Sequence, residues 1–117
     1  MTGFDPDYFL PANLTSVQKV TAQNTKGNTL SQNYPNPFNA RTTIDFDLIS
    51  DQRLQIIIYS LSGNQVRNLA NSTFSAGKNS VSWDGTDDAG NKVNSGLYCY
   101  VLMNNNEQLS KKMIYTR

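Results

Sequence analysis

Histidine is absent from the chain, and cysteine occurs only once, at Cys99. Without histidine the chain can form neither a Ser-His-Asp triad nor a Cys-His pair, and it can offer no imidazole to a metal ion. A single cysteine forms no internal disulfide and does not indicate a redox compartment. These absences remove most classes of enzyme, so the sequence predicts a non-catalytic protein that uses no cofactor and no metal.

Charge is scarce as well, because 10 basic and 9 acidic residues leave a net charge of +1 in 117 residues. No basic run could neutralise several phosphates, so nucleic acid is not expected as a partner. No stretch approaches the length of about 18 apolar residues that a membrane span needs, and the first residues lack a basic start followed by an apolar run. The sequence therefore predicts no membrane-spanning segment, and for an exported protein the signal would lie upstream of Met1.

Uncharged polar residues are abundant instead: Asn, Ser and Thr make up 36 of the 117 residues. This composition favours short strands and turns, and the length allows one core. Residues 1–29 show no strand or helix periodicity, and we expect a linker or the end of a preceding domain there, with the domain proper at residues 30–117. Within the first part, residues 4–11 hold three aromatics and two prolines, which suits docking on a surface or the end of a preceding domain.

Hydrophobic alternation with a period of two begins at Thr42, where Ile44, Phe46 and Leu48 alternate with polar residues. No helix of useful length is indicated. We expect strands at residues 42–48, 53–59, 65–69, 78–83, 97–103 and 108–115, with one more near Leu30 or Phe74. The pattern predicts an all-β fold, an antiparallel immunoglobulin-like β-sandwich of about seven strands without a disulfide.

Two features of the strands bear on packing. Trp83 is expected at the centre of the core. Residues 97–103 are apolar at nearly every position, as in a strand covered by the core on one face and by something else on the other. Cys99 lies in this strand and is expected to be a buried small hydrophobe.

Acidic residues form two groups. Asp84, Asp87 and Asp88 precede Asn91 in one loop, but their spacing does not follow the alternating ligand pattern of a calcium loop, and Ser95 stands where a closing Glu would fall. We expect Asp84 and Asp87 to accept hydrogen bonds from turn amides. The second group, Asp45 and Asp47, shares one strand face and is expected to be solvated and not catalytic.

An ordered set of short motifs carries a family resemblance. The motifs are Tyr-Pro-Asn-Pro-Phe at residues 34–38, Thr-Thr-Ile at 42–44, Ile-Tyr at 58–59, Leu-Ser-Gly at 61–63, Ala-Gly at 76–77, Trp-Asp-Gly-Thr-Asp at 83–87, Gly-Asn at 90–91, Ser-Gly-Leu-Tyr at 95–98 and Lys-Lys-Met at 111–113. From about Leu30 to the end the chain resembles the type A C-terminal sorting domain of type IX secretion cargo (the Por secretion family), found in Bacteroidota and neighbouring phyla. The Trp-Asp-Gly and Ser-Gly-x-Tyr motifs also occur in the related immunoglobulin-like domain of flagellar hook-capping proteins.

The resemblance implies a sorting signal and not a catalyst. Such domains direct an upstream cargo domain through an outer-membrane translocon, and a surface sortase-like protease commonly removes them, so the expected location is secreted or on the cell surface, reached through the periplasm and the outer membrane. The motif residues of the family fall here on Pro35, Asn36, Pro37, Gly96, Tyr98, Lys111 and Lys112. The tail departs from the family, and Arg117 stands where members often end in lysine.

Each motif also allows a structural interpretation. The two prolines around Asn36 predict an extended, polyproline-like segment whose neighbours Tyr34 and Phe38 anchor in the core's edge. Gly96 fits a backbone requirement where a loop becomes a strand. Lys111 and Lys112 alternate across a strand and fit either a solvated sheet edge or a contact with a receptor.

Two other functional classes compete with sorting. A carbohydrate-binding or adhesive module would need an exposed planar set of aromatics, for which Tyr59, Tyr98 and Tyr100 are the candidates. A structural spacer or assembly domain would resemble the hook-capping relative and would be recognised by self-association.

Overall fold

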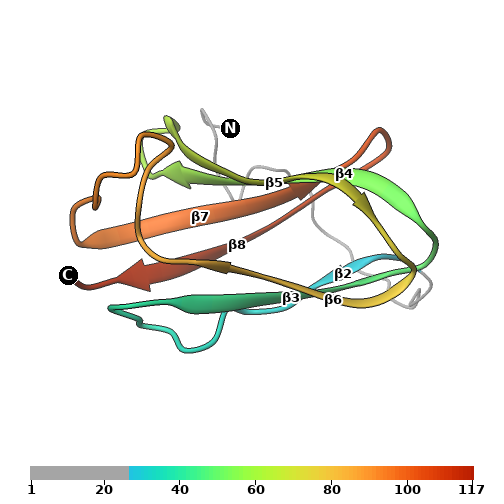
Figure 1. Cartoon of the computed structure of the whole chain (residues 1–117), viewed down its shortest axis with the longest axis horizontal. Coiled ribbons are helices and arrows are strands. Elements are labelled where there is room, and N and C mark those ends of the chain that lie inside the picture. The colour runs from blue at the N-terminus through green and yellow to red at the C-terminus, as the bar shows by residue number, and fades with distance from the viewer. Residues whose placement is uncertain (1–26) are drawn as a thin grey trace.

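The structure, a computed structural model, describes residues 27–117, so residues 1–26 of the predicted linker, with the aromatic segment at residues 4–11, lie outside the described residues. Seven strands form two sheets (Figure 1). One sheet has the order β2-β3-β6, with β2 at Thr29–Leu30, β3 at Thr42–Leu48 and β6 at Gly77–Trp83. The other has the order β5-β4-β7-β8, with β4 at Gln52–Ser60, β5 at Gln65–Phe74, β7 at Gly96–Met103 and β8 at Gln108–Tyr115.

All strand pairs are antiparallel. The described residues contain no helix, and Cys99, the single cysteine of the sequence, is buried and forms no disulfide within the chain. The predicted all-β antiparallel sandwich without a disulfide is therefore confirmed. Within residues 27–117 there is also no helix long and apolar enough to cross a membrane.

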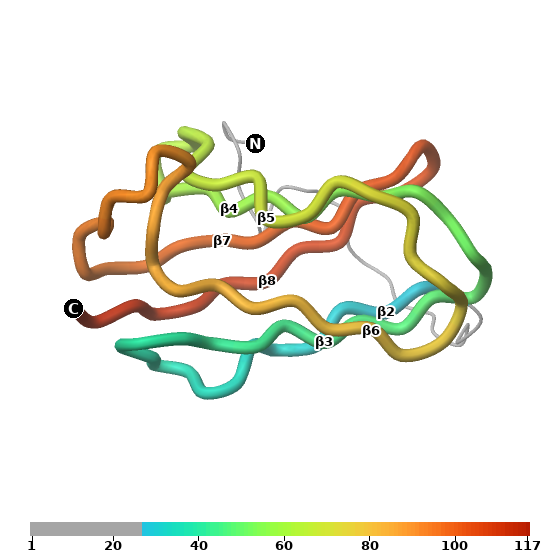
Figure 2. The backbone as a smooth tube through the Cα atoms, in the orientation of Figure 1, coloured from blue at the N-terminus to red at the C-terminus, as the bar shows by residue number. Residues whose placement is uncertain are grey.

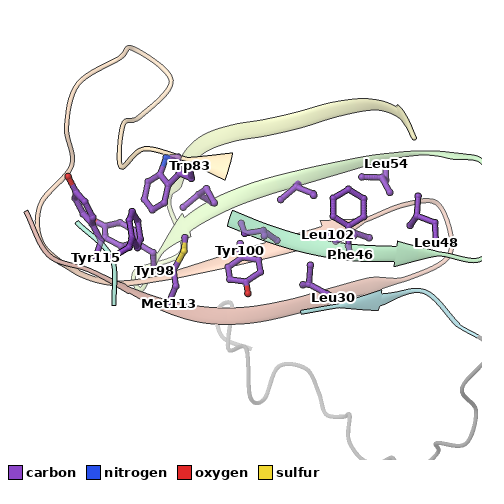
Figure 3. Close-up of a cluster of buried hydrophobic side chains, with 14 residues drawn as sticks. Leu30, Phe46, Leu48, Leu54, Trp83, Tyr98, Tyr100, Leu102, Met113 and Tyr115 are labelled. Carbon is purple, nitrogen blue, oxygen red and sulfur yellow. The ribbon is translucent and has the colours of Figure 1, made fainter. Parts of the chain in front are cut away.

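The core lies between the sheets and follows the alternation seen in the sequence. On β3, Ile44, Phe46 and Leu48 are buried while Asp45 between them is exposed. Trp83 is 1% exposed and so belongs to the core as predicted, but it lies at one end of the core and not at its centre (Figure 3). Aliphatic side chains and Phe46 fill one end of the core, whereas Trp83, Tyr98 and Tyr115 gather at the other end (Figure 3).

Strand β5 is longer than expected, since only residues 65–69 were predicted. The turn that precedes it is as predicted: Ser60 N donates to Asn64 O at 2.9 Å, and Gly63 adopts a φ of +92°. The pairing with β4 shifts register between Ile56 and Ile57 and again between Ile58 and Tyr59. These shifts fall at residues 65–70, within the predicted part of the strand. Residues 70–74, beyond the predicted part, pair with β4 in regular register, but they read Ala-Asn-Ser-Thr-Phe and have too few apolar residues to show alternation.

Strand β2 is short but confirms the expected strand near Leu30. Its pairing with β3 continues past the strand through Ser31 N, which donates to Asp45 O at 2.9 Å. Just before β2, the buried Asn28 donates from Nδ2 to Glu107 Oε2 at 2.6 Å and to Gln52 Oε1 at 2.9 Å. The chain is therefore fixed to the start of β4 and to the β7–β8 turn from Asn28 onward.

Candidate recognition site

Two of the three predicted motif regions, residues 35–37 and Gly96 with Tyr98, lie at one end of the sandwich beside the C-terminal end of β8. Figure 2 shows the loop between β2 and β3 and the C-terminal end of the chain at this end. The loop carries residues 35–37, the C-terminal end carries residues 115–117, and Gly96 pairs with Tyr115 across β7 and β8. We call these three parts together the motif end.

The Pro-Asn-Pro loop is held from beneath by two buried polar side chains. Pro35 O accepts hydrogen bonds from Thr42 Oγ1 at 2.8 Å and from Asn33 Nδ2 at 3.1 Å. Asn33 is 3% exposed and Thr42 is 1% exposed, and Asn33 Nδ2 also donates to Thr42 Oγ1 at 2.9 Å. Residues 35–37 themselves are exposed. The loop thus presents a fixed conformation to solvent.

The expectation of an extended, polyproline-like segment is wrong. Residues 35–37 form a bend, and the Tyr34–Pro35 and Asn36–Pro37 peptide bonds are both cis. The physical reason is the inward-facing Pro35 carbonyl, because its two buried donors hold it toward the core, whereas a polyproline helix leaves every carbonyl solvated.

Hydrogen bonds join the loop to the outer edge of β8. Ile114 N donates to Asn36 Oδ1 at 2.9 Å, and Phe38 N donates to Ile114 O at 3.1 Å. Thr116 N donates to Phe38 O at 2.9 Å. The loop therefore caps the C-terminal part of an edge strand, which would otherwise present unpaired backbone groups.

An aromatic cluster lies under the motif end. The Phe38 ring lies 4.9 Å from the Tyr115 ring and 5.6 Å from the Trp83 ring, measured between centroids. Phe38 is 3% exposed, which confirms it as an anchor. Tyr34 does not anchor: its side chain is 79% exposed, because its backbone pairs with Thr43 on β3 and the ring points away from the core. The cluster gives the exposed loop a rigid base.

Gly96 and Tyr98 have structural roles in this arrangement. Gly96 adopts a φ of +153°, and a Cβ added there would meet nothing within 4 Å, so conformation and not space requires glycine. Tyr98 is 7% exposed and its hydroxyl donates to Asn94 O at 2.6 Å. Burial raises the pKa of Tyr98, and the nearby Tyr115 adds to this. Tyr98 is therefore part of the core and offers little surface to a partner.

Lys111 and Lys112 lie further along β8 and face opposite sides of the sheet, as the alternation predicted. Lys111 pairs with Tyr100 and is half-buried, whereas Lys112 pairs with Cys99 and is exposed. Gln32 Nε2 donates to Lys112 O at 2.7 Å. The segment before the Pro-Asn-Pro loop thus continues along the same strand edge toward the lysines.

The acidic loop is tied together by its own hydrogen bonds. Asp84 Oδ1 accepts from Thr86 Oγ1 at 2.6 Å, and the bond from the Thr86 side chain is the main cause that lowers the pKa of Asp84. Asp87 Oδ1 accepts from the amides of Ala89 and Asn91 at 3.0 and 2.9 Å. The expectation of turn-capping aspartates is confirmed, and residues 27–117 hold no group of three or more acidic or cysteine side chains placed to bind a metal ion.

The aromatic surface considered for carbohydrate binding is not formed. Tyr98 and Tyr100 are buried in the core at 7% and 0% exposure. Tyr59 pairs with Cys99, which stands between Tyr98 and Tyr100 on β7. Successive residues of a strand face opposite sides, so Tyr59 lies on the opposite face of the sheet from Tyr98 and Tyr100. The three rings therefore cannot form one exposed plane.

Sequence reasoning missed two supports of the site. The first is the Asn33–Thr42 pair. Its only signal in the sequence was Thr42, a polar residue at a core-facing position of the first alternating strand. The second is Gly85, which the sequence marked only as a turn residue. A Cβ at Gly85 would lie 2.6 Å from Cζ of Tyr115. Asn33 and Thr42 lie on either side of the Pro-Asn-Pro loop, and Gly85 and Tyr115 come from different parts of the chain, so neither contact appears in a strand or turn pattern.

We expect Thr42→Val to lower the free energy of unfolding by about 1–2 kcal/mol, because the isosteric side chain leaves Pro35 O and Asn33 with fewer partners in a buried place. Urea unfolding followed by far-UV circular dichroism measures the change. Thr43→Val, at a half-buried position on the other face of β3, is the control and should change stability by less than about 0.5 kcal/mol. Equal effects of the two substitutions would contradict this role of Thr42.

Comparisons with known proteins agree with the fold. A crystal structure of dimeric latent PorU from Porphyromonas gingivalis is 22% identical over 86% of this chain, with a TM-score of 0.59. PorZ, described as an essential bacterial surface component of the type IX secretion system of the same organism, is 20% identical over 78% of this chain, with a TM-score of 0.50. This chain matches only 10% and 12% of the lengths of those chains. Among curated proteins, no sequence is similar enough to count as a match.

Identities this low show a shared fold and nothing more. The family comparison reaches further, because the sequence model of the FlgD Ig-like domain matches residues 27–108, which is most of the chain. The two-sheet antiparallel architecture is consistent with that match. The chain therefore belongs to the FlgD Ig-like domain family.

Proposed function

We propose that this domain is a non-catalytic sorting signal that directs an attached cargo protein across the outer membrane by type IX secretion. The observation that carries the proposal is the motif end: the Pro-Asn-Pro loop and the C-terminal end of β8 are 78 residues apart in sequence, yet hydrogen bonds join them. A surface built from both is presented only by the folded domain. An outer-membrane translocon would read this surface.

The similarity of fold to PorZ supports the proposal, since PorZ is described as a surface component of that secretion system. The order of the motifs supports it independently. In this account the cargo lies upstream, a sortase-like protease removes the domain at the cell surface, and the domain itself supplies recognition and no chemistry.

A reporter fusion tests the function directly. The whole chain is attached to the C-terminus of a fluorescent protein that carries a periplasmic export signal, in a host with the type IX machinery. We expect fluorescence on the cell surface, measured by protease accessibility of intact cells. The same fusion in a host without the translocon should stay in the periplasm, and equal accessibility in the two hosts would remove the proposal.

A double variant tests whether Lys111 and Lys112 belong to the recognised surface. We expect Lys111→Ala with Lys112→Ala to leave the urea midpoint nearly unchanged, because both side chains lie on an edge strand and neither belongs to the core. Export of the fused reporter should fall at least about tenfold, if the lost contacts are worth about 1.4 kcal/mol or more in binding. Normal export of the double variant would exclude both lysines from the recognised surface.

The matched control for the lysines lies on the opposite edge of the same sheet. Asn71→Ala with Ser72→Ala changes two exposed positions of β5. Export of this variant should equal that of the unchanged chain. A loss as large as that of the lysine variant would mean that export depends on general properties of the sheet edges.

A further inference from the structure

The four-stranded sheet has a second apolar face, turned away from the sheet formed by β2, β3 and β6. The register of β4, β7 and β8 brings Ile57 opposite Val101, Tyr59 opposite Cys99, and Leu97 opposite Ile114. None of these six residues belongs to the core cluster between the sheets. We call this set the outer face; its residues are Ile57, Tyr59, Leu97, Cys99, Val101 and Ile114.

The centre of the outer face is buried. Ile57 is 6% exposed, Val101 is 1% exposed and Cys99 is 0% exposed. Burial is also the main cause that raises the pKa of Tyr59 beside them. Among the described strands, none forms a layer over this face (Figure 1). An antiparallel sheet that faces water normally alternates polar and apolar residues along each strand, whereas β7 is apolar on both faces.

The margin of the outer face is open and carries two positive charges: Arg53, exposed near the start of β4 on the same face as Ile57, and Lys112 on β8. Leu97 is 41% exposed and Ile114 is 39% exposed. Lys112 follows on the same face of β8, opposite Cys99, and is exposed. A matching segment would therefore bring aromatic or aliphatic side chains to the centre and a negative charge to the edge.

We propose that residues 4–11 of this same chain dock on the outer face. This segment reads Phe-Asp-Pro-Asp-Tyr-Phe-Leu-Pro, so it combines three aromatic rings with two carboxylates. The rings of Phe4, Tyr8 and Phe9 supply a large apolar area at a low cost in side-chain entropy. Asp5 and Asp7 complement Lys112 at the margin. The chemistry of the segment therefore matches both the centre and the edge of the face.

The chain is long enough to make this contact. Asn28 is fixed next to Gln52, the first residue of β4, and next to the β7–β8 turn, so the described part of the chain begins at one end of the four-stranded sheet. The 16 residues between Pro11 and Asn28 can span about 53 Å when extended, by the usual rise of about 3.3 Å per residue. The longest dimension of the described part of the chain is 38 Å. Every part of the outer face is thus within reach.

Cys99 is the natural probe of this contact, because it is the only cysteine and lies at the centre of the face. The rate at which a maleimide modifies Cys99 is measured in the full chain and in the variant Phe4→Ser, Tyr8→Ser, Phe9→Ser. We expect the variant to react at least about tenfold faster, because removal of the rings raises the population of the uncovered form. Far-UV circular dichroism and Trp83 fluorescence check that the sandwich is unchanged.

Two further variants make the test specific. Gln18→Ser, Gln23→Ser and Asn24→Ser change three polar residues of the connecting stretch, and the maleimide rate should stay at that of the unchanged chain. Lys112→Glu should raise the rate, and Asp5→Lys with Asp7→Lys added to it should lower the rate again. A rate restored by the charge exchange would show that residues 4–11 contact the outer face, because a general loosening of the sheet would not be reversed by changes at Asp5 and Asp7.

Equal maleimide rates in the full chain and in the triple-ring variant would overturn the proposal. So would a rate that falls as the protein concentration rises, with a dimer in sedimentation, because a second copy would then cover the face. The inference does not rest on the sorting function, since none of these measurements involves secretion.

Discussion

Replacing Tyr115 by alanine is expected to lower the free energy of unfolding by about 4 kcal/mol, because removing a fully buried aromatic side chain costs both its transfer free energy and the cavity it leaves. Tyr115 is 1% exposed, and its ring lies 4.9 Å from the Phe38 ring and 5.9 Å from the Trp83 ring. A domain of this size is stable by only about 5–15 kcal/mol, so the loss is a large fraction of the total.

Urea unfolding followed by far-UV circular dichroism measures the effect without relying on the fluorescence of the neighbouring Trp83. Ile114→Ala, one residue away and 39% exposed, is the control and should cost about 1 kcal/mol or less. If the two substitutions cost the same, Tyr115 is not the base on which the motif end rests.

Replacing Gly85 by alanine is expected to cost about 3 kcal/mol. Gly85 adopts a φ of +79°, and a Cβ there would lie 2.6 Å from Cζ and 2.8 Å from the hydroxyl oxygen of Tyr115. The left-handed conformation alone costs alanine about 1 kcal/mol, and overpacking a buried ring adds about 1–3 kcal/mol. The ring cannot yield easily, because Phe38 and Trp83 pack against it.

Gly90 provides a matched control for this prediction. It has a similar φ of +91°, but a Cβ there would meet nothing within 4 Å. Gly90→Ala should therefore show only the conformational cost of about 1 kcal/mol. The difference between the two variants in urea unfolding isolates the contact with Tyr115. A difference near zero would mean that the Asp84-Gly85 turn does not lie against the ring in solution.

Local patterns were sufficient to predict most strands of this fold. Alternation with a period of two located β3, and the Ser62-Gly63-Asn64 sequence located the turn after β4, because each signal depends on neighbours in sequence. The prediction for β5 ended at residue 69, because residues 70–74 are mostly polar and show no apolar alternation although they pair regularly with β4. The two apolar faces of β7 were also predicted correctly, because the faces of a strand follow from its own sequence. What covers the second face depends on residues elsewhere in the chain.

The candidate site was harder to predict than the fold. The prolines at positions 35 and 37 were recognised, but the shape of their loop depends on Asn33 and Thr42 beneath it, and local preference suggested an extended segment. Tyr34 was placed in the core because it is aromatic, and only its pairing with Thr43 turns it outward. That the loop caps β8 follows from contacts 78 residues apart, which no local pattern records.

The central claim is that this chain directs secretion through features of its own and not through its fold alone. The most direct test compares it with another domain of the same family. One reporter carries the full chain at its C-terminus, and a second carries an immunoglobulin-like domain of a flagellar hook-capping protein from the same family, chosen to lack the Tyr-Pro-Asn-Pro-Phe sequence. In one host with the type IX machinery, the surface-exposed fraction of each reporter is measured by protease accessibility. The account predicts that only the reporter with this chain reaches the surface. Equal surface fractions for the two reporters would contradict it.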